Sequence, residues 1–205
     1  MSVNRYRSQR IELFLNRFNP DSQTKILDVG GSSEIWLDTG LNRNVTLLNL
    51  TKPKKRDLDL GFQCVQADAL NMKEIQDQAY DIAFSNSVIE HVGGYSEQKK
   101  LADEIRRVGK SYWIQTPNRY FPIEPHLMFP YAQFLPSIAE RWVALYWPYS
   151  SYRRWGVEKK RTIQFLDKTL LLTEGELRTL FPNSTIYKEK IAGITKSLIA
   201  WKKGE

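Results

Sequence analysis

Polar side chains follow the apolar runs of this chain, at places where a ligand could be held. Asp28 lies inside the apolar run Ile26–Val29, directly before the pair Gly30 and Gly31. A lone carboxylate among apolar neighbours is costly unless it is hydrogen-bonded or bound to a partner. Glycine lets the backbone turn with positive φ and lets a ligand approach without meeting a Cβ. The stretch is therefore a candidate ligand site, although a strand and a tight turn without a ligand have the same pattern.

The glycine turn does not match the dinucleotide-binding fingerprint. That fingerprint needs a third glycine three residues after the second, and here Ser32, Ser33 and Glu34 follow the pair. Glu34 would also place a negative charge near a pyrophosphate. These residues argue against NAD, but they leave room for a ligand without phosphates.

Each of the two histidines lies beside a glutamate, as Glu90-His91 and as Glu124-Pro125-His126. An imidazole titrates near neutral pH, and a carboxylate can hold its orientation. We therefore expect His126 and Glu124 to be catalytic, with His126 as a general base. A hydrogen-bonded turn histidine is the alternative for His126, and a structural role is the alternative for His91. With two histidines and one cysteine, no metal site is expected.

The elements that must position these residues alternate between strands and helices. Strand patterns fall at 25–29, 45–50, 62–67, 80–85 and 111–116, and helix patterns at 5–18, 33–40 and 95–108. Such alternation predicts a parallel sheet. Ligands of such sheets bind at the carboxyl ends of the strands, so the polar residues there should share one crevice.

The end of the chain follows a different pattern. Thr173–Glu176 is a capping box that begins a helix, and two strands at 184–190 and 196–202 surround Gly193. The sequence therefore predicts an α/β fold with a doubly wound, mostly parallel seven-stranded sheet, a C-terminal antiparallel hairpin and an aromatic-rich insertion. At 205 residues we expect a single domain over 1–205, with the insertion at about 118–165.

Five motifs in this order resemble the class I S-adenosylmethionine-dependent methyltransferases, in particular the UbiE/UbiG-like (type 11) branch, which acts mostly on small molecules. The motifs are Asp28 to Gly31, Asn49, Asp68-Ala69, Ser85 to Val92 and the closing hairpin. The resemblance covers about 25–117 and 170–202. Each motif is weak alone, and their order makes the resemblance specific.

The resemblance implies S-adenosylmethionine as cofactor and assigns its contacts. The implied cofactor residues are Asp28, Gly30, Gly31, Asn49, Leu50, Asp68, Ala69, Ser85 and Asn86. Asp28 would hold the methionyl amine and Asp68 the adenine amino group, unless Asp68 only forms a turn. Asn49 departs from the family, which has an acid that takes both ribose hydroxyls. An aspartate in its place should keep or strengthen binding, unless the strand register is wrong or the site is degenerate.

The insertion is rich in aromatic residues and leaves the carboxyl end of the fifth strand. We read it as a substrate lid whose rings are buried, with Ile138, Trp142 and Leu145 at helical spacing. The substrate residues we expect are His91, Asn118 and Arg119. A dimer interface and a peripheral membrane contact are alternatives, because rings gather at interfaces and basic residues flank them here.

We therefore expect methyl transfer to a small-molecule acceptor at a hydroxyl or carboxyl group. No Pro-Pro-aromatic run follows Ser85-Asn86-Ser87, which disfavours methylation of adenine amino groups. The net charge of +7 favours anionic partners and makes an RNA methyltransferase one alternative. A non-catalytic protein that keeps the fold is another.

Nucleic acid is not the expected partner, and the chain is expected to be a monomer or a homodimer. One cysteine and a polar, basic N-terminus without an apolar run fit a reducing cytoplasm.

Overall fold

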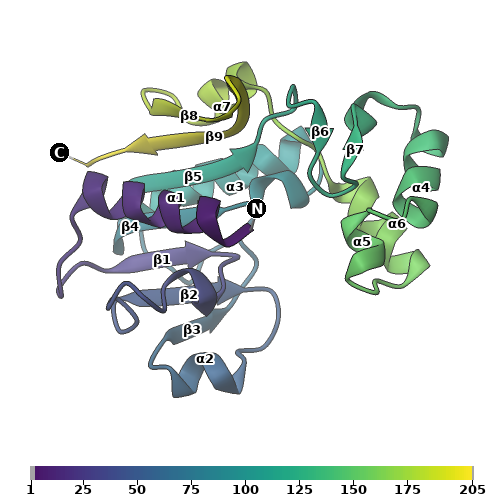
Figure 1. Ribbon diagram of the computed structural model, residues 1–205. Coiled ribbons are helices and arrows are strands. Elements are labelled where there is room, and N and C mark those ends of the chain that lie inside the picture. The colour runs from purple at the N-terminus through teal and green to yellow at the C-terminus, as the bar shows by residue number, and fades with distance from the viewer. Residues whose placement is uncertain (1–2, 205) are drawn as a thin grey trace. The chain divides into compact units, whose positions relative to one another are not determined.

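A computed structural model describes residues 3–204 of the chain, and their side chains from residue 6 on. The chain divides into two compact units. The first comprises the residues up to Asn86, Lys100–Ile114 and the chain from Trp201 on, and the second comprises Ser87–Lys99 and Gln115–Ala200. Figure 1 labels the helices and strands of both units.

A seven-stranded sheet confirms the predicted fold class. Its order is β3 (Gln63–Gln66), β2 (Val45–Asn49), β1 (Ile26–Val29), β4 (Tyr80–Asn86), β5 (Gly109–Pro117), β9 (Ile194–Lys202) and β8 (Thr185–Ile191). The strand β1 pairs in parallel with β2 and β4, and β2 pairs in parallel with β3. The sheet contains one antiparallel pair, and a separate two-stranded hairpin is made by β6 (Ile123–Glu124) and β7 (Phe129–Pro130).

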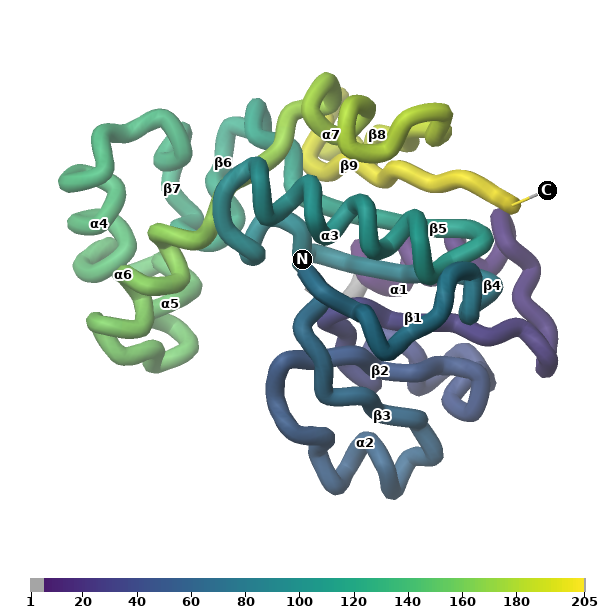
Figure 2. Tube along the Cα trace, turned by 180° about the vertical axis from the view of Figure 1, so that it is seen from behind, coloured from purple at the N-terminus to yellow at the C-terminus, as the bar shows by residue number. Residues whose placement is uncertain are grey.

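The first unit is layered around the parallel strands. All four residues of β1 are buried, as expected for a strand covered on both faces. Helices α1 (Val3–Phe18) and α3 (Tyr95–Val108) lie on opposite faces of the sheet in both views (Figures 1 and 2). Helix α1 is anchored by Phe14, whose ring lies 5.2 Å from that of Phe84 and 5.7 Å from that of Trp113. The predicted amphipathic helix is thereby confirmed.

Two short segments of the first unit differ from the sequence prediction. The helix expected over 33–40 is only a single 3₁₀ turn, η1 (Ser33–Ile35). The basic loop after β2 contains a short helix, α2 (Lys55–Asp59), that buries no side chain. A helix that buries nothing has no apolar periodicity in its sequence, and the pattern therefore missed it.

The second unit holds the insertion and the capped helix. Helices α4 (Ser137–Tyr146), α5 (Ser151–Arg154) and α6 (Lys159–Lys168) gather beside the β6–β7 hairpin (Figure 1), and 3₁₀ turns form at η2 (Ile89–His91) and η3 (Ala132–Phe134). Their core consists of Leu127, Ala132, Val143, Ala144, Tyr152 and Leu166. The capping box that begins α7 (Glu174–Leu180) is confirmed, since Thr173 and Glu176 exchange both of its hydrogen bonds.

The buried face of α4 is not the predicted one. Ile138 and Trp142 are 85% and 60% exposed, while Val143 and Ala144 on the other side are buried. The expectation that the aromatic rings of the insertion are buried was therefore wrong for Trp142, and also for other rings such as Tyr120, Tyr149 and Trp155, which are 64%, 62% and 69% exposed. Helical spacing identifies a stripe of apolar residues, but the small Ala144 allows close packing that no spacing reveals.

Within the part of the chain that the structure describes, we find no helix with the length and apolar character needed to span a bilayer.

Candidate functional site

Asp28 is the buried polar group at the carboxyl end of β1. Its side chain is 1% exposed, and its Oδ2 accepts a hydrogen bond from Trp36 Nε1 at 2.7 Å. Its Oδ1 is buried and accepts no hydrogen bond from any residue that the structure describes. Burial, partly offset by the hydrogen bond from Trp36, raises the pKa of Asp28 from 3.8 to about 7. A cationic or hydrogen-bond-donating ligand would satisfy this oxygen and favour the ionised form.

The glycine pair makes room for that carboxylate. Gly30 has a φ of +71°, and its N–H donates to the carbonyl of Leu48 at 2.7 Å. A Cβ on Gly31 would lie 1.8 Å from Asp28 Oδ2. Gly31 is therefore needed for the position of Asp28 itself, in addition to the ligand approach that the sequence suggested.

Asn49, at the end of β2, is tied to the same turn. Its Nδ2 donates to the carbonyl of Gly31 at 3.0 Å, which leaves Oδ1 as an acceptor. Asn49 and Gly31 line an open pocket, together with residues that include Lys52 and Cys64. A carboxylate in place of the amide would face the Gly31 carbonyl, so the expectation that aspartate strengthens binding now meets an opposing effect. Leu50 follows with its side chain 70% exposed.

Asp68 and Ala69 follow β3 in an exposed turn. Asp68 Oδ1 accepts from the N–H of Leu70 at 2.9 Å, which is the turn-forming contact that the sequence gave as the alternative. One carboxylate oxygen is thus used within the turn. Neither residue lines the pocket that contains Gly31 and Asn49.

Ser85 and Asn86 end β4. Ser85 is fully buried, and its hydroxyl donates to the carbonyl of Val29 at 3.3 Å, so it joins β4 to β1. Asn86 Oδ1 accepts from Arg10 Nη1 at 3.4 Å. The first unit therefore places the ends of β1, β2 and β4 in one region, whereas Asp68 after β3, which was expected in the same crevice, does not line the pocket of Gly31 and Asn49.

Sequence reasoning missed two residues of this region. Trp36 is fully buried and donates to Asp28, although it was expected in a helix after the turn. Arg10 is 8% exposed and comes from α1, 76 positions before Asn86. The sequence shows Arg10 only as part of a polar helix face. A contact over such a separation leaves no local signal.

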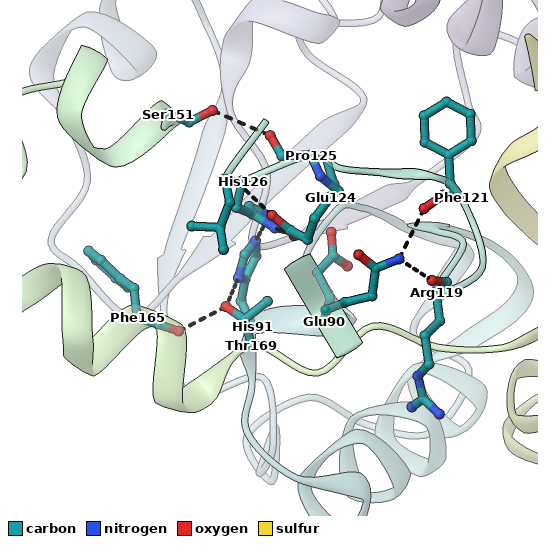
Figure 3. Close-up of polar contacts among 12 residues, drawn as sticks. Glu90, His91, Arg119, Phe121, Glu124, Pro125, His126, Ser151, Phe165 and Thr169 are labelled. Atoms are coloured by element: carbon teal, nitrogen blue, oxygen red, sulfur yellow. Dashed lines mark hydrogen bonds and ion pairs between the residues drawn. The ribbon is translucent and has the colours of Figure 1, made fainter. Parts of the chain in front are cut away.

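A second polar cluster lies within the second unit and is drawn in Figure 3. His126, in the loop between β6 and β7, places Nδ1 2.7 Å from Glu124 Oε1. Its Nε2 lies 3.1 Å from Nε2 of His91, and His91 Nδ1 lies 3.1 Å from Thr169 Oγ1. The structure therefore brings together three of the residues predicted to be catalytic or substrate-binding.

Hydrogen-bond donors in this cluster fix where the protons lie. Thr169 donates its only proton to the carbonyl of Phe165 at 2.8 Å, so it must accept one from His91 Nδ1. Burial, and then the neighbouring His126, lower the pKa of His91 to about 4. Burial also acts to lower the pKa of His126, but the hydrogen bond and charge of Glu124, with the charge of Glu90, raise it above its ordinary value. In the absence of a metal ion, a proton between the two Nε2 atoms is therefore bound to His126 and not to His91.

Asn118 and Arg119, which were also predicted to bind substrate, are not part of this cluster. Asn118 Nδ2 donates to the carbonyl of Thr195 at 2.9 Å. Arg119 Nε donates to the carbonyl of Leu171 at 2.7 Å, and its Nη1 lies 3.1 Å from Glu176 Oε1. Both side chains hold the chain's own segments together.

Comparison with known proteins gives this geometry a context. Residues 30–112 match the protein family described as a methyltransferase domain. Two uncharacterised proteins of Mycobacterium tuberculosis, one from each of two strains, are 38% identical over 56 residues, which is 27% of this chain and 19% of theirs. The matched segment thus spans about a fifth of the length of these curated relatives.

Solved structures resemble the whole chain. A Rhodobacter sphaeroides protein described as a zinc-dependent alcohol dehydrogenase has a TM-score of 0.61 at 13% identity, over 96% of this chain and 90% of that one. The N-methyltransferase NodS from Bradyrhizobium japonicum, solved with S-adenosyl-L-homocysteine, has a TM-score of 0.55 at 10% identity, over 97% and 85%. An S-adenosylmethionine-dependent methyltransferase from Archaeoglobus fulgidus has a TM-score of 0.54 at 13% identity, over 95% and 94%.

At these identities the structural likeness shows the fold alone. The match at residues 30–112, which covers less than half of the chain, supports a methyltransferase domain over those residues.

Proposed function

We propose that this chain transfers the methyl group of S-adenosylmethionine to a small-molecule acceptor. The observation that carries the proposal is the buried Asp28, whose Oδ1 lacks a partner among the described residues at the carboxyl end of β1. This is the edge at which ligands of doubly wound sheets bind. The methyltransferase-domain match begins at Gly30, within the same turn.

The residues of the first unit fit the polar groups of this cofactor. Asp28 Oδ1 would accept from the methionyl ammonium, which removes the cost of an unpaired buried oxygen. Asn49 Oδ1 would accept from a ribose hydroxyl while its amide stays on Gly31. Arg10 brings a guanidinium to the end of β4, suited to a carboxylate. Asp68 keeps one carboxylate oxygen for the adenine amino group.

When bound, S-adenosylmethionine supplies an already activated methyl group, so the protein's main contribution is alignment of the acceptor. Positioning of two reactants is worth on the order of 7–11 kcal/mol. A hydroxyl acceptor must also lose its proton, and a positioned base adds roughly 10²–10⁴-fold. We assign this step to His126, oriented by Glu124. Because Nε2 of His126 faces His91 and holds the proton they share, the base role requires that proton to leave and the acceptor to take the place of His91.

The acceptor class rests on the segment after β4. Asn86-Ser87-Val88 follows Ser85 in place of the Pro-Pro-aromatic run of adenine N-methyltransferases. This absence disfavours adenine amino groups as acceptors, and the UbiE/UbiG-like branch that the motifs resemble acts mostly on small molecules, so we propose a small-molecule hydroxyl or carboxyl group.

Calorimetric titration with S-adenosylmethionine and S-adenosylhomocysteine tests the cofactor. Asp28→Asn should abolish binding, while Asp59→Asn, which changes an exposed carboxylate on α2, should bind as the wild type does. A panel of hydroxyl and carboxyl compounds, followed by release of S-adenosylhomocysteine, then tests the acceptor.

Failure of the wild-type chain to bind either cofactor form would refute the proposal and favour a non-catalytic role. Turnover on RNA alone, with salt-dependent binding, would refute the small-molecule acceptor.

A further inference from the structure

The chain's two histidines face each other inside the second unit (Figure 3). His91 comes from η2 and His126 from the loop between β6 and β7, 35 positions later. Their Nε2 atoms lie 3.1 Å apart, and their rings are nearly perpendicular, at 77°. Two imidazole nitrogens at this distance either share a hydrogen, with one ring donating N–H to the other, or bind a common ion.

Both rings form hydrogen bonds through Nδ1, on the side away from the Nε2 atoms. Glu124 accepts from Nδ1 of His126 at 2.7 Å, and Thr169 accepts from Nδ1 of His91 at 3.1 Å. A proton on Nδ1 leaves the lone pair of a neutral imidazole on Nε2. The two Nε2 lone pairs therefore point into the same space. They repel unless a proton or a metal ion lies there.

The spacing suits a metal ion. Two imidazole nitrogens bound to one ion at about 2.1 Å lie about 3.0–3.4 Å apart, depending on coordination geometry. Histidine ligands of metals also donate Nδ1–H to a carboxylate or another oxygen, which fixes the ring. Glu124 and Thr169 supply those two acceptors here.

The carboxylate of Glu90 offers a third ligand atom. One carboxylate oxygen of Glu90 and the ring nitrogens of His91 and His126 all lie within 4.8 Å of one another. Glu90 is fully buried, and its Oε2 accepts from Thr116 Oγ1 at 3.0 Å. Two imidazoles and a carboxylate are the ligand set of catalytic zinc sites and of non-haem iron sites, which keep further positions open.

Charge also favours a divalent cation. Glu90 and Glu124 are 0% and 4% exposed, and burial of two carboxylates is costly unless cations balance them. A divalent ion held by two neutral histidines would bring two positive charges beside these carboxylates.

We propose that His91, His126 and Glu90 bind a divalent transition-metal ion, with Zn²⁺ as the first candidate, and that Glu124 and Thr169 orient the histidine ligands. Ions that prefer oxygen ligands, such as Mg²⁺, fit this donor set poorly. The open positions would take water or an oxygen-bearing ligand, whose pKa the ion would lower. The proposal does not depend on methyl transfer. A chain with bound metal cannot use His126 as a base, because its Nε2 atom is then a ligand.

The first test uses the untagged wild-type chain, because a histidine tag would bind the same ions. After exposure to Zn²⁺ and dialysis, elemental analysis should give one zinc per chain. Co²⁺ should produce visible d–d absorption bands that Zn²⁺ abolishes. Zn²⁺ at about a hundredfold over its dissociation constant should raise the melting temperature by about 5–10 °C, whereas Mg²⁺ should not.

The second test uses variants that circular dichroism shows to be folded. His91→Gln, His126→Gln and Glu90→Gln should each lose the cobalt bands. Glu124→Gln should keep them with metal affinity about 10–100-fold weaker, as expected for an orienting residue. Asp167→Asn is the matched control, since it changes a half-exposed carboxylate of the same unit, paired with Arg141 on the surface.

A wild-type chain without bound metal, without cobalt bands and with an unchanged melting temperature would mean that the rings share a proton only, and would overturn the proposal. Metal retained by the double variant of both histidines would place the site elsewhere and overturn the assignment. Neither result bears on cofactor binding, which the calorimetric titration measures separately.

Discussion

Asp28→Asn should make the protein more stable and unable to bind S-adenosylhomocysteine. The asparagine oxygen can still accept the hydrogen bond from Trp36, so the exchange removes a buried negative charge with little change in shape. Binding should fail because a neutral amide cannot form an ion pair with the methionyl ammonium. Stability should rise because the unliganded protein no longer ionises a carboxylate that is 1% exposed.

The size of the gain follows from the pKa of Asp28, which burial raises from 3.8 to about 7. The folded state then holds a proton that the unfolded state has already released, so stability falls as the pH rises between these two values and is flat above. The full difference is about 4 kcal/mol. The side-chain amide of the asparagine has a hydrogen without a partner, which costs about 1–3 kcal/mol and reduces the gain in stability. We therefore expect a net gain of about 2 kcal/mol, or about 4–8 °C in melting temperature, above neutral pH.

Thermal melts of both proteins across pH provide the measurement. The difference in melting temperature between the variant and the wild type should increase from about pH 4 to about pH 7 and then stay constant. Calorimetry at alkaline pH gives the affinity for S-adenosylhomocysteine in parallel. A variant that is less stable at every pH and binds normally would mean that Asp28 is a structural cap, and the cofactor assignment would fall with it.

Three further substitutions test other contacts of the two units. Gly31→Ala should weaken S-adenosylhomocysteine binding tenfold or more, about 1.4 kcal/mol, because its Cβ would displace the Asp28 carboxylate. Gly175→Ala in α7 is the control, since a Cβ there would meet nothing nearer than Thr173 Oγ1 at 4.0 Å. Equal affinity of both variants would contradict the steric argument. Asn49→Asp should also weaken binding in calorimetry, since the hydrogen bond to the Gly31 carbonyl is lost, and tighter binding would show that the ribose contact outweighs the turn. Thr173→Ala should lower stability by about 1 kcal/mol through loss of the α7 cap, with no change in cofactor affinity; an unchanged melting temperature would mean that α7 does not need its cap.

The sequence by itself determined the strands and turns of the first unit. Apolar runs that end in glycine or a polar residue are local signals, and parallel strands buried on both faces make them strong. The run that contains Asp28 and the capping box at Thr173 could be read for this reason. The carboxyl ends of such strands share one edge, so the meeting of the Gly31 turn with Asn49 followed from topology.

Only the tertiary structure decided which distant side chains meet. His91 and His126 are 35 positions apart, on a 3₁₀ turn and a hairpin loop, and no periodicity links them. The small number of histidines and cysteines in the sequence argued against a metal site. Such a count does not show that both imidazoles point into one space. The buried face of α4 was predicted wrongly for a similar reason. Which stripe of a helix is covered depends on the shape of its neighbours, and shape complementarity is a property of packed elements that local sequence does not encode.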